Sequence, residues 1–142
     1  MNHISALSYC HHDSEKFAGE EYRLKFLSLP RPRSDAENNL YFETFHARTE
    51  THRDDRFWLD ISEAHPATDP RKWVYSDETP VSWTNWKDGE PNDHGDGEPL
   101  VEVDPNRFWN DVKDSTEHMF MCVYYLPVGA ENACPWLLDY QD

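Results

Sequence analysis

The segment from Ser82 to Glu98 constrains the fold more than any other part of the chain. Its sequence, SWTNWKDGEPNDHGDGE, places glycines and a proline among many Asn, Asp and Glu residues, and it follows neither the helical nor the strand period. We therefore expect one long loop here. Because loops of this length are uncommon inside compact domains and are usually functional, we expect the flanking elements to form a scaffold that holds it.

Apolar patterns on both sides of the loop predict the elements of an α+β domain. Residues Ile4–Tyr9, with Cys10 continuing the helical spacing, predict a first helix, and Ser34 with Glu37 fits a capping box that begins a second. The runs that predict short, mostly antiparallel strands are Leu24–Leu29, Phe57–Ile61, Trp73–Tyr75, Leu100–Val103 and Phe120–Leu126. We therefore predict one domain over residues 1–126, followed by a tail at 127–142.

The acidic composition narrows the class of partner. The chain has 142 residues, the size of one ordinary domain, with 13 Lys and Arg against 28 Asp and Glu and a formal net charge of −15. Such a surface repels nucleic acid phosphates and anionic membranes and attracts divalent cations, although solubility alone would also explain it. No apolar run is long enough to cross a bilayer, and the first residues lack the pattern of a signal peptide.

The three cysteines, Cys10, Cys122 and Cys134, leave two arrangements open. A bridge between Cys10 and Cys122 would close a long loop and contribute roughly 4–5 kcal/mol in the chain-entropy model. Three reduced thiols are the alternative, as a cytosolic chain would have them. The count alone does not decide, because one cysteine must stay unpaired within a monomer.

Oxygen-bearing side chains are concentrated in the long loop and in one later segment. In chain order they are Glu90, Asn92, Asp93, Asp96, Glu98, Asn110 and Asp111. The two groups would meet if the strand at Leu100–Val103 turns back along its neighbour. Calcium prefers about 6–8 oxygen ligands, whereas zinc would prefer His and Cys, of which the loop offers only His94. The residues favour calcium over zinc, while an ordinary Gly- and Asp-rich turn remains the alternative.

Two triplets in this region carry a family resemblance. Glu90-Pro91-Asn92 lies within WTNWKDGEPNDHGDGE, and Trp109-Asn110-Asp111 lies within FWND. Together, in this order, and with FWLDI upstream, they resemble the calcium-dependent carbohydrate-recognition domains of the C-type lectins, especially the mannose-binding collectins. The resemblance covers residues 1–126 and implies the fold of that family, with two helices, short antiparallel sheets and a long calcium-binding loop.

The resemblance implies a calcium ion whose ligands also bind the sugar. The residues implied for both roles are Glu90, Asn92, Glu98, Asn110 and Asp111. The Glu-Pro-Asn order implies glycans with equatorial 3- and 4-hydroxyls, of the mannose, N-acetylglucosamine, glucose or fucose type, whereas Gln-Pro-Asp would imply galactose. Pro91 matches a proline that follows a cis peptide bond, which is expected at only about 5–6% of X-Pro bonds. Glu63 and Asp93 are the implied candidates for an accessory calcium ion.

The resemblance also predicts how the cysteines are used and where the chain differs from the family. It pairs Cys10 with Cys122. An inner bridge would fall near Leu100 and Asp114, and since neither is cysteine, we predict that this bridge is absent. The family strand that precedes the first helix is expected to be missing, which would leave the last strand with an open edge.

Three classes of function are compatible with a chain of this composition. The resemblance favours a secreted or extracellular lectin that binds glycans with calcium, in several copies, because binding at one site alone is weak. Cys134 could join chains, or it could be a free or buried thiol. A domain of the same fold that binds a protein, ice or a mineral surface is the alternative. An enzyme is disfavoured, because HExxH, GxSxG and P-loop motifs are absent.

Overall fold

A computed structural model describes residues 1–17, 26–48, 56–95 and 97–125 of the chain. Within these ranges the elements are α1 (His3–Phe17), β1 (Phe26–Ser28), α2 (Asp35–Arg48), β2 (Phe57–Glu63), β3 (Trp73–Val74), β4 (Leu100–Val103), β5 (Trp109–Val112) and β6 (Val123–Tyr125). The predicted α+β class is confirmed. The tail at 127–142, including Cys134, lies outside the described residues, as do Leu24 and Leu126.

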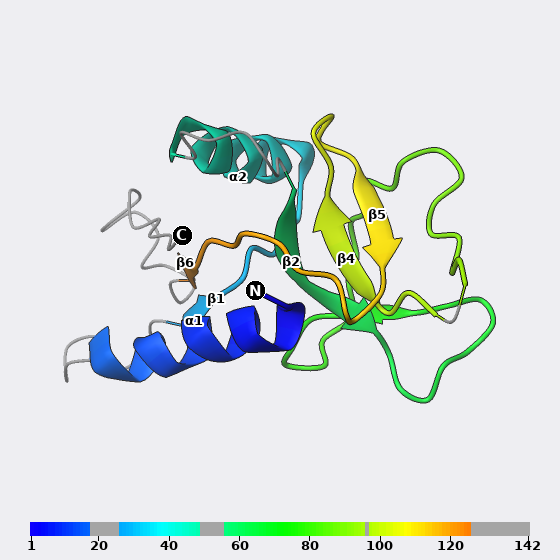
Figure 1. Cartoon of the computed structure of the whole chain (residues 1–142), viewed down its shortest axis with the longest axis horizontal. Helices are drawn as coiled ribbons and strands as arrows, with labels where there is room; N and C mark the ends of the chain where they lie inside the picture. The colour runs from blue at the N-terminus through cyan, green and yellow to red at the C-terminus, as the bar shows by residue number, and fades with distance from the viewer. Residues whose placement is uncertain (18–25, 49–55, 96, 126–142) are drawn as a thin grey trace.

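The strands form two antiparallel sheets. One sheet has the order β3-β2-β4-β5, and the other pairs β1 with β6. The two helices and the β1–β6 pair lie on one side of the larger sheet, and the long connections between β2 and β4 spread on the other side (Figure 1). This arrangement places the long loop at the edge of the molecule, next to β5.

The second helix begins where its capping residue predicts. Ser34 Oγ accepts a hydrogen bond of 3.1 Å from the backbone N–H of Glu37, which satisfies one of the free donors at the helix start. The Glu37 carboxylate accepts from the N–H of Arg33, at 2.9 Å, one residue earlier than the capping-box pattern predicts. The first helix continues beyond the predicted segment and ends at Phe17.

Strand β2 separates two hydrophobic clusters. Phe57, Leu59 and Ile61 face a cluster that includes residues of α2, and Trp58 faces a second cluster that includes Ala6 of α1. The strand is therefore buried on both faces over Phe57–Ile61, which explains why Asp60 is the one polar residue in that run.

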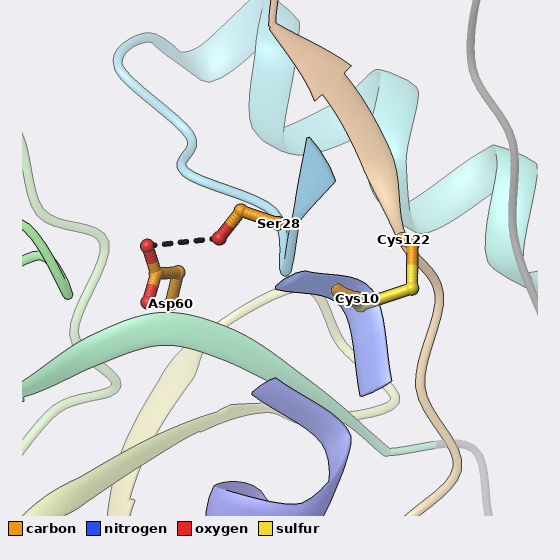
Figure 2. Close-up of a disulfide and its surroundings, with 4 residues drawn as sticks. All are labelled: Cys10, Ser28, Asp60 and Cys122. Atoms are coloured by element: carbon orange, nitrogen blue, oxygen red, sulfur yellow. Dashed lines mark hydrogen bonds between the residues drawn. A yellow bond between two sulfur atoms is a disulfide. The ribbon is translucent and has the colours of Figure 1, made fainter. Parts of the chain in front are cut away.

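A disulfide and a buried charged group fix the side of the molecule that carries α1. Cys10 of α1 is bonded to Cys122, as predicted, and both are buried. Figure 2 shows the bridge and, beside it, the hydrogen bond of 3.0 Å from Ser28 Oγ to Asp60 Oδ2. The same carboxylate oxygen accepts from Arg31 Nε at 2.6 Å. Because this ion pair is buried, removing Arg31 would leave the Asp60 carboxylate with no counter-charge at hydrogen-bond distance among the described residues.

The predicted strands near the end of the domain differ from the structure at β5 and β6. Residues 109–112 form β5, whereas the sequence indicated only an approach to Asn110-Asp111, because a strand this short has little pattern. The last strand begins at Val123, later than predicted. It pairs with β1 along one edge, and among the described strands no other pairs with its second edge. An isolated bridge joins Asn2 to Glu117.

Leu100 and Asp114, where the inner disulfide of the family would fall, lie close together in the structure. Leu100 pairs with Val112 in the β4–β5 ladder, two residues before Asp114. Leu100 and Asp114 both line a hollow of about 410 Å³ beside the start of α1. In this chain, therefore, no disulfide joins the segment that enters the β4–β5 hairpin to the segment that leaves it.

Candidate functional site

The β4–β5 hairpin brings the two groups of oxygen donors together. Val101 pairs with Asp111 and Glu102 with Asn110 in its ladder. The start of the loop also pairs with β5, because Trp109 N donates to Asn85 O at 2.8 Å. The loop thus runs along β5 at its beginning and continues into β4 at its end, and this holds it next to Asp111.

Asp111 is the centre of the site. Its side chain is fully buried, and its two oxygens accept the backbone N–H groups of Asn92, at 3.0 Å, and of Asp93, at 2.8 Å. Arg71 Nη1 donates to the same carboxylate at 2.7 Å. Burial opposes the charge, but the hydrogen bonds from these donors and from Glu90 lower the pKa of Asp111. It is therefore an ionised carboxylate that fixes the turn after Pro91.

Glu90 carries the clearest sign of a missing partner. Its Oε1 accepts from Asn92 Nδ2 at 3.0 Å, while its Oε2 is buried and reaches no hydrogen-bond donor in the described part of the chain. Burial, and then the hydrogen bond with Asp111 and the charge of that carboxylate, raises the pKa of Glu90 to about 7. Because an unpaired buried carboxylate oxygen is costly, this atom fits a site for a cation.

The remaining loop residues are joined by short hydrogen bonds. The N–H of His94 donates to Glu98 Oε1 at 2.6 Å, and the N–H of Glu98 donates to Asp93 Oδ1 at 3.0 Å. The peptide bond between Glu90 and Pro91 is cis, as the resemblance predicts, and Asp93 has a φ of 50°. These contacts bring Glu90, Asn92 and Glu98 to the same side of β5 as the Asp111 carboxylate.

Asn110 lies apart from the other four predicted ligands. Its Nδ2 donates to Glu102 Oε1 at 3.0 Å, and among the described residues no hydrogen bond joins its side chain to Glu90, Asn92 or Glu98. Neighbouring side chains on a strand point to opposite faces, so Asn110 and Asp111 diverge. The structure therefore brings four of the five predicted ligands together and places the fifth beside Glu102.

Glu102 is the partner of Asn110, which the sequence did not reveal. It is buried and also contacts His118 Nε2 and, at 2.5 Å, Arg56 Nη1. Burial opposes its charge, but the hydrogen bonds from His118 and Asn110 lower the pKa of Glu102. Its position as an acidic residue within an otherwise apolar strand, LVEV, was the available signal.

The two candidates for accessory calcium ligands contact a cation of the chain itself. Glu63 Oε1 lies 3.0 Å and Asp93 Oδ1 3.5 Å from Nη2 of Arg71. Arg71 was not predicted, because its role depends on contacts distant in sequence.

The donor set is suited to calcium, although its side chains are not arranged around one point. The grouped atoms are hard oxygens, with three carboxylates at Glu90, Glu98 and Asp111 and an amide at Asn92. Within the described ranges, no three His, Cys, Asp or Glu side chains form a ready metal site, since donors of the loop occupy several of their oxygens. Calcium would therefore bind with local rearrangement of the loop, in exchange for these hydrogen bonds.

Comparison with known families and proteins agrees with this reading of the fold. A family model described as the Lectin C-type domain matches residues 24–124. The chain is 35% identical over 75 residues to hepatic lectin of Gallus gallus, which is 53% of this chain and 36% of that protein. It is 31% identical over 99 residues to pulmonary surfactant-associated protein D of Bos taurus, covering 68% of this chain and 24% of that one. The chain thus spans about a quarter to a third of these relatives.

Solved structures share the fold at low sequence identity. The carbohydrate-recognition domain of cow CD23, determined in the presence of a GlcNAc2Man3 oligosaccharide, matches with a TM-score of 0.66 and 20% identity, over 90% of this chain and 82% of that one. The lectin CEL-I from Cucumaria echinata matches with a TM-score of 0.68 and 17% identity, over 86% of this chain and 84% of that one.

None of the helices in the described ranges has the length and apolar character needed to span a membrane.

Proposed function

Because this chain belongs to the C-type lectin domain family, we propose that it binds glycans through a calcium ion held by Glu90, Asn92, Glu98, Asn110 and Asp111. The family is non-catalytic, so the chain is a binding protein and not an enzyme. The observation that carries the calcium proposal is the buried, unpaired Oε2 of Glu90 next to the ionised Asp111.

The charges of the ligand set support calcium. Glu90, Glu98 and Asp111 are three carboxylates in contact with the same short loop. Burial, and then the hydrogen bond with Asp111 and the repulsion from the other two carboxylates, raises the pKa of Glu90 to about 7. A divalent cation would relieve that repulsion and supply coordination positions for two neighbouring sugar hydroxyls. The side chain of Asn110 would have to leave Glu102 to join the set, and the strand would have to turn locally to bring it to the face of Asp111.

The order of acceptor and donor supports mannose-type ligands. In the structure the Asn92 amide donates to the Glu90 carboxylate, and a sugar would have to replace this bond to use the acceptor of Glu90 and the donor of Asn92. We propose that the pair reads equatorial 3- and 4-hydroxyls, as in mannose, N-acetylglucosamine or fucose. The oligosaccharide named for the cow CD23 domain contains mannose and N-acetylglucosamine, which is compatible with this choice.

The setting we propose is extracellular, with several copies acting together. The Cys10–Cys122 disulfide supports an oxidising compartment. Several copies would compensate for weak binding at each site, and the described residues contain no feature that favours a protein, ice or mineral ligand instead.

Glycan binding with and without calcium tests the proposal. The protein is expected to bind immobilised mannose in calcium, to be released by a chelator and to ignore immobilised galactose. Asp111→Asn should abolish binding, while Asp104→Asn should not, because Asp104 is also buried but only stabilises the turn at 104–108. Equal retention on mannose with and without calcium would refute the calcium proposal.

A further inference from the structure

Arg71 places a fixed positive charge beside the candidate calcium ligands. It lies in the connection between β2 and β3, directly after the cis Asp69–Pro70 peptide bond. The sequence gives no reason for an arginine at this point, since its neighbours in the chain are not part of the site. Its side chain is nevertheless only 17% exposed.

The guanidinium of Arg71 connects three separate segments through oxygen atoms. Nη1 donates to Asp111 Oδ2 of β5 at 2.7 Å. Nη2 donates to Glu63 Oε1 of β2 at 3.0 Å and to the carbonyl oxygen of Glu98, at the end of the loop, at 2.8 Å. Only a planar, forked cation can make such contacts at once, because its donors are fixed relative to one another.

An aromatic ring and several carboxylates surround the Arg71 guanidinium and keep it charged. The Arg71 guanidinium carbon lies 4.7 Å from the centre of the Trp73 ring, which covers one face and excludes water. Burial opposes the charge, but the carboxylates of Glu63 and Asp111 raise the pKa of Arg71 further above its normal value. Without the guanidinium, the carboxylates of Glu63, Asp93 and Asp111 would face each other with no counter-charge in the described part of the chain.

We propose that Arg71 is a positioning residue that takes the place of a second divalent ion. It holds the described loop residues, 90–95 and 97–98, on β5 before calcium binds, and it occupies the space between Glu63 and Asp93 that an accessory ion would need. The site therefore takes one calcium ion per chain. The positioning role is independent of the proposed function, whereas the stoichiometry rests on it.

The positioning role is tested by amide hydrogen exchange in excess chelator. The amides of Asn92 and Asp93 donate to Asp111, so their protection reports whether the loop stays on β5. Arg71→Gln should make both exchange at least about tenfold faster than in the wild type, since local opening limits exchange there. Arg71→Lys keeps the charge but cannot bridge three segments, and it should give intermediate rates.

The matched control removes the same charge elsewhere. Arg107→Gln acts on a side chain that is 44% exposed and contacts Asn39 and Glu43, away from the site. It should leave the exchange of Asn92 and Asp93 at the wild-type rate. Equal rates in Arg71→Gln and Arg107→Gln would overturn the proposal. If Arg71→Gln does not fold, Arg71→Lys carries the comparison, and wild-type rates in that variant would overturn the proposal as well.

The stoichiometry is measured on the wild-type protein by calorimetric titration with calcium. One ion per chain is expected, and two would overturn the claim that the guanidinium takes the second position. If no calcium binds at all, the proposed function fails, and the exchange rates in chelator still decide whether Arg71 orders the loop.

Discussion

Two halves of this domain are held together by different forces. The half that contains α1, β1 and β6 has a buried disulfide, a hydrophobic cluster with Trp58 and a buried Arg31–Asp60 pair. The half that contains the loop at 90–98 is held by hydrogen bonds to carboxylates and by Arg71. The difference teaches that the first half is held by apolar packing and a covalent bond, whereas the order of the second half depends on how its negative charge is balanced.

Removing the disulfide is the largest expected perturbation, and it should affect the first half. Replacing Cys10 and Cys122 together by serine should lower the free energy of unfolding by roughly 4–5 kcal/mol, because the bridge closes a loop with a sequence separation of 112 residues. Denaturant unfolding in chelator measures the change. Calcium affinity at 10 °C, where the variant remains folded, should stay within about threefold of the wild type. A loss below about 1 kcal/mol would mean that the bridge contributes little order.

Calcium should stabilise the second half, and Asp111 should be required for that effect. At a calcium concentration about 100 times the dissociation constant, the free energy of unfolding should rise by about 2.7 kcal/mol. Asp111→Ala should abolish this gain together with glycan binding, since the ligand and the acceptor of two loop amides are both lost. The change is measured by thermal unfolding with calcium and with chelator. An unchanged melting temperature in the wild type would contradict the proposed site.

Exchanging the acceptor and the donor of the loop should change the glycan preference without changing the first half. Glu90→Gln combined with Asn92→Asp should shift relative binding from mannose toward galactose by about tenfold or more, since each reversed hydrogen bond leaves an unpaired polar group. Competition with free sugars on a glycan array provides the ratio. A double variant that still prefers mannose would show that this pair does not select the ligand.

The pH dependence of calcium binding is the smallest expected effect and reports on Glu90. Its pKa is raised to about 7, so a proton competes with calcium near neutral pH. Calcium affinity should fall by about threefold from pH 7.5 to pH 6.5, because the ionised fraction decreases over this range. Titration calorimetry at both values measures the change, and Glu90→Gln should remove most of it.

The stability of the ion-free protein should depend on the same group with the opposite sign. The pKa of Glu90 is higher in the folded chain than its ordinary value of 4.5. Its contribution to stability is therefore complete below about pH 4.5 and is lost as the pH rises to about 7. In the ion-free protein, Glu90 therefore contributes least to the free energy of unfolding at the pH at which calcium binds best.

The fold and the elements of the site follow closely from the sequence. The buried strand at Phe57–Ile61 was readable because four of its five residues are apolar, and Ser34 marked the start of α2 because its side chain caps the helix. The loop was predicted from its lack of any period. Glu90 and Asp111 were assigned to one site because the Glu-Pro-Asn and Trp-Asn-Asp triplets resemble a family pattern. No local pattern in the sequence indicates that the two residues lie together.

Only the tertiary structure decided how charge is balanced around the loop. Arg71 reaches Asp111 across 40 residues, and Glu102 reaches Asn110 through strand pairing. Neither contact leaves a local pattern, because electrostatic partners are selected by distance in space and not by spacing in the chain. The sequence determined which oxygens are available to an ion. The tertiary structure determined which of them already have a partner.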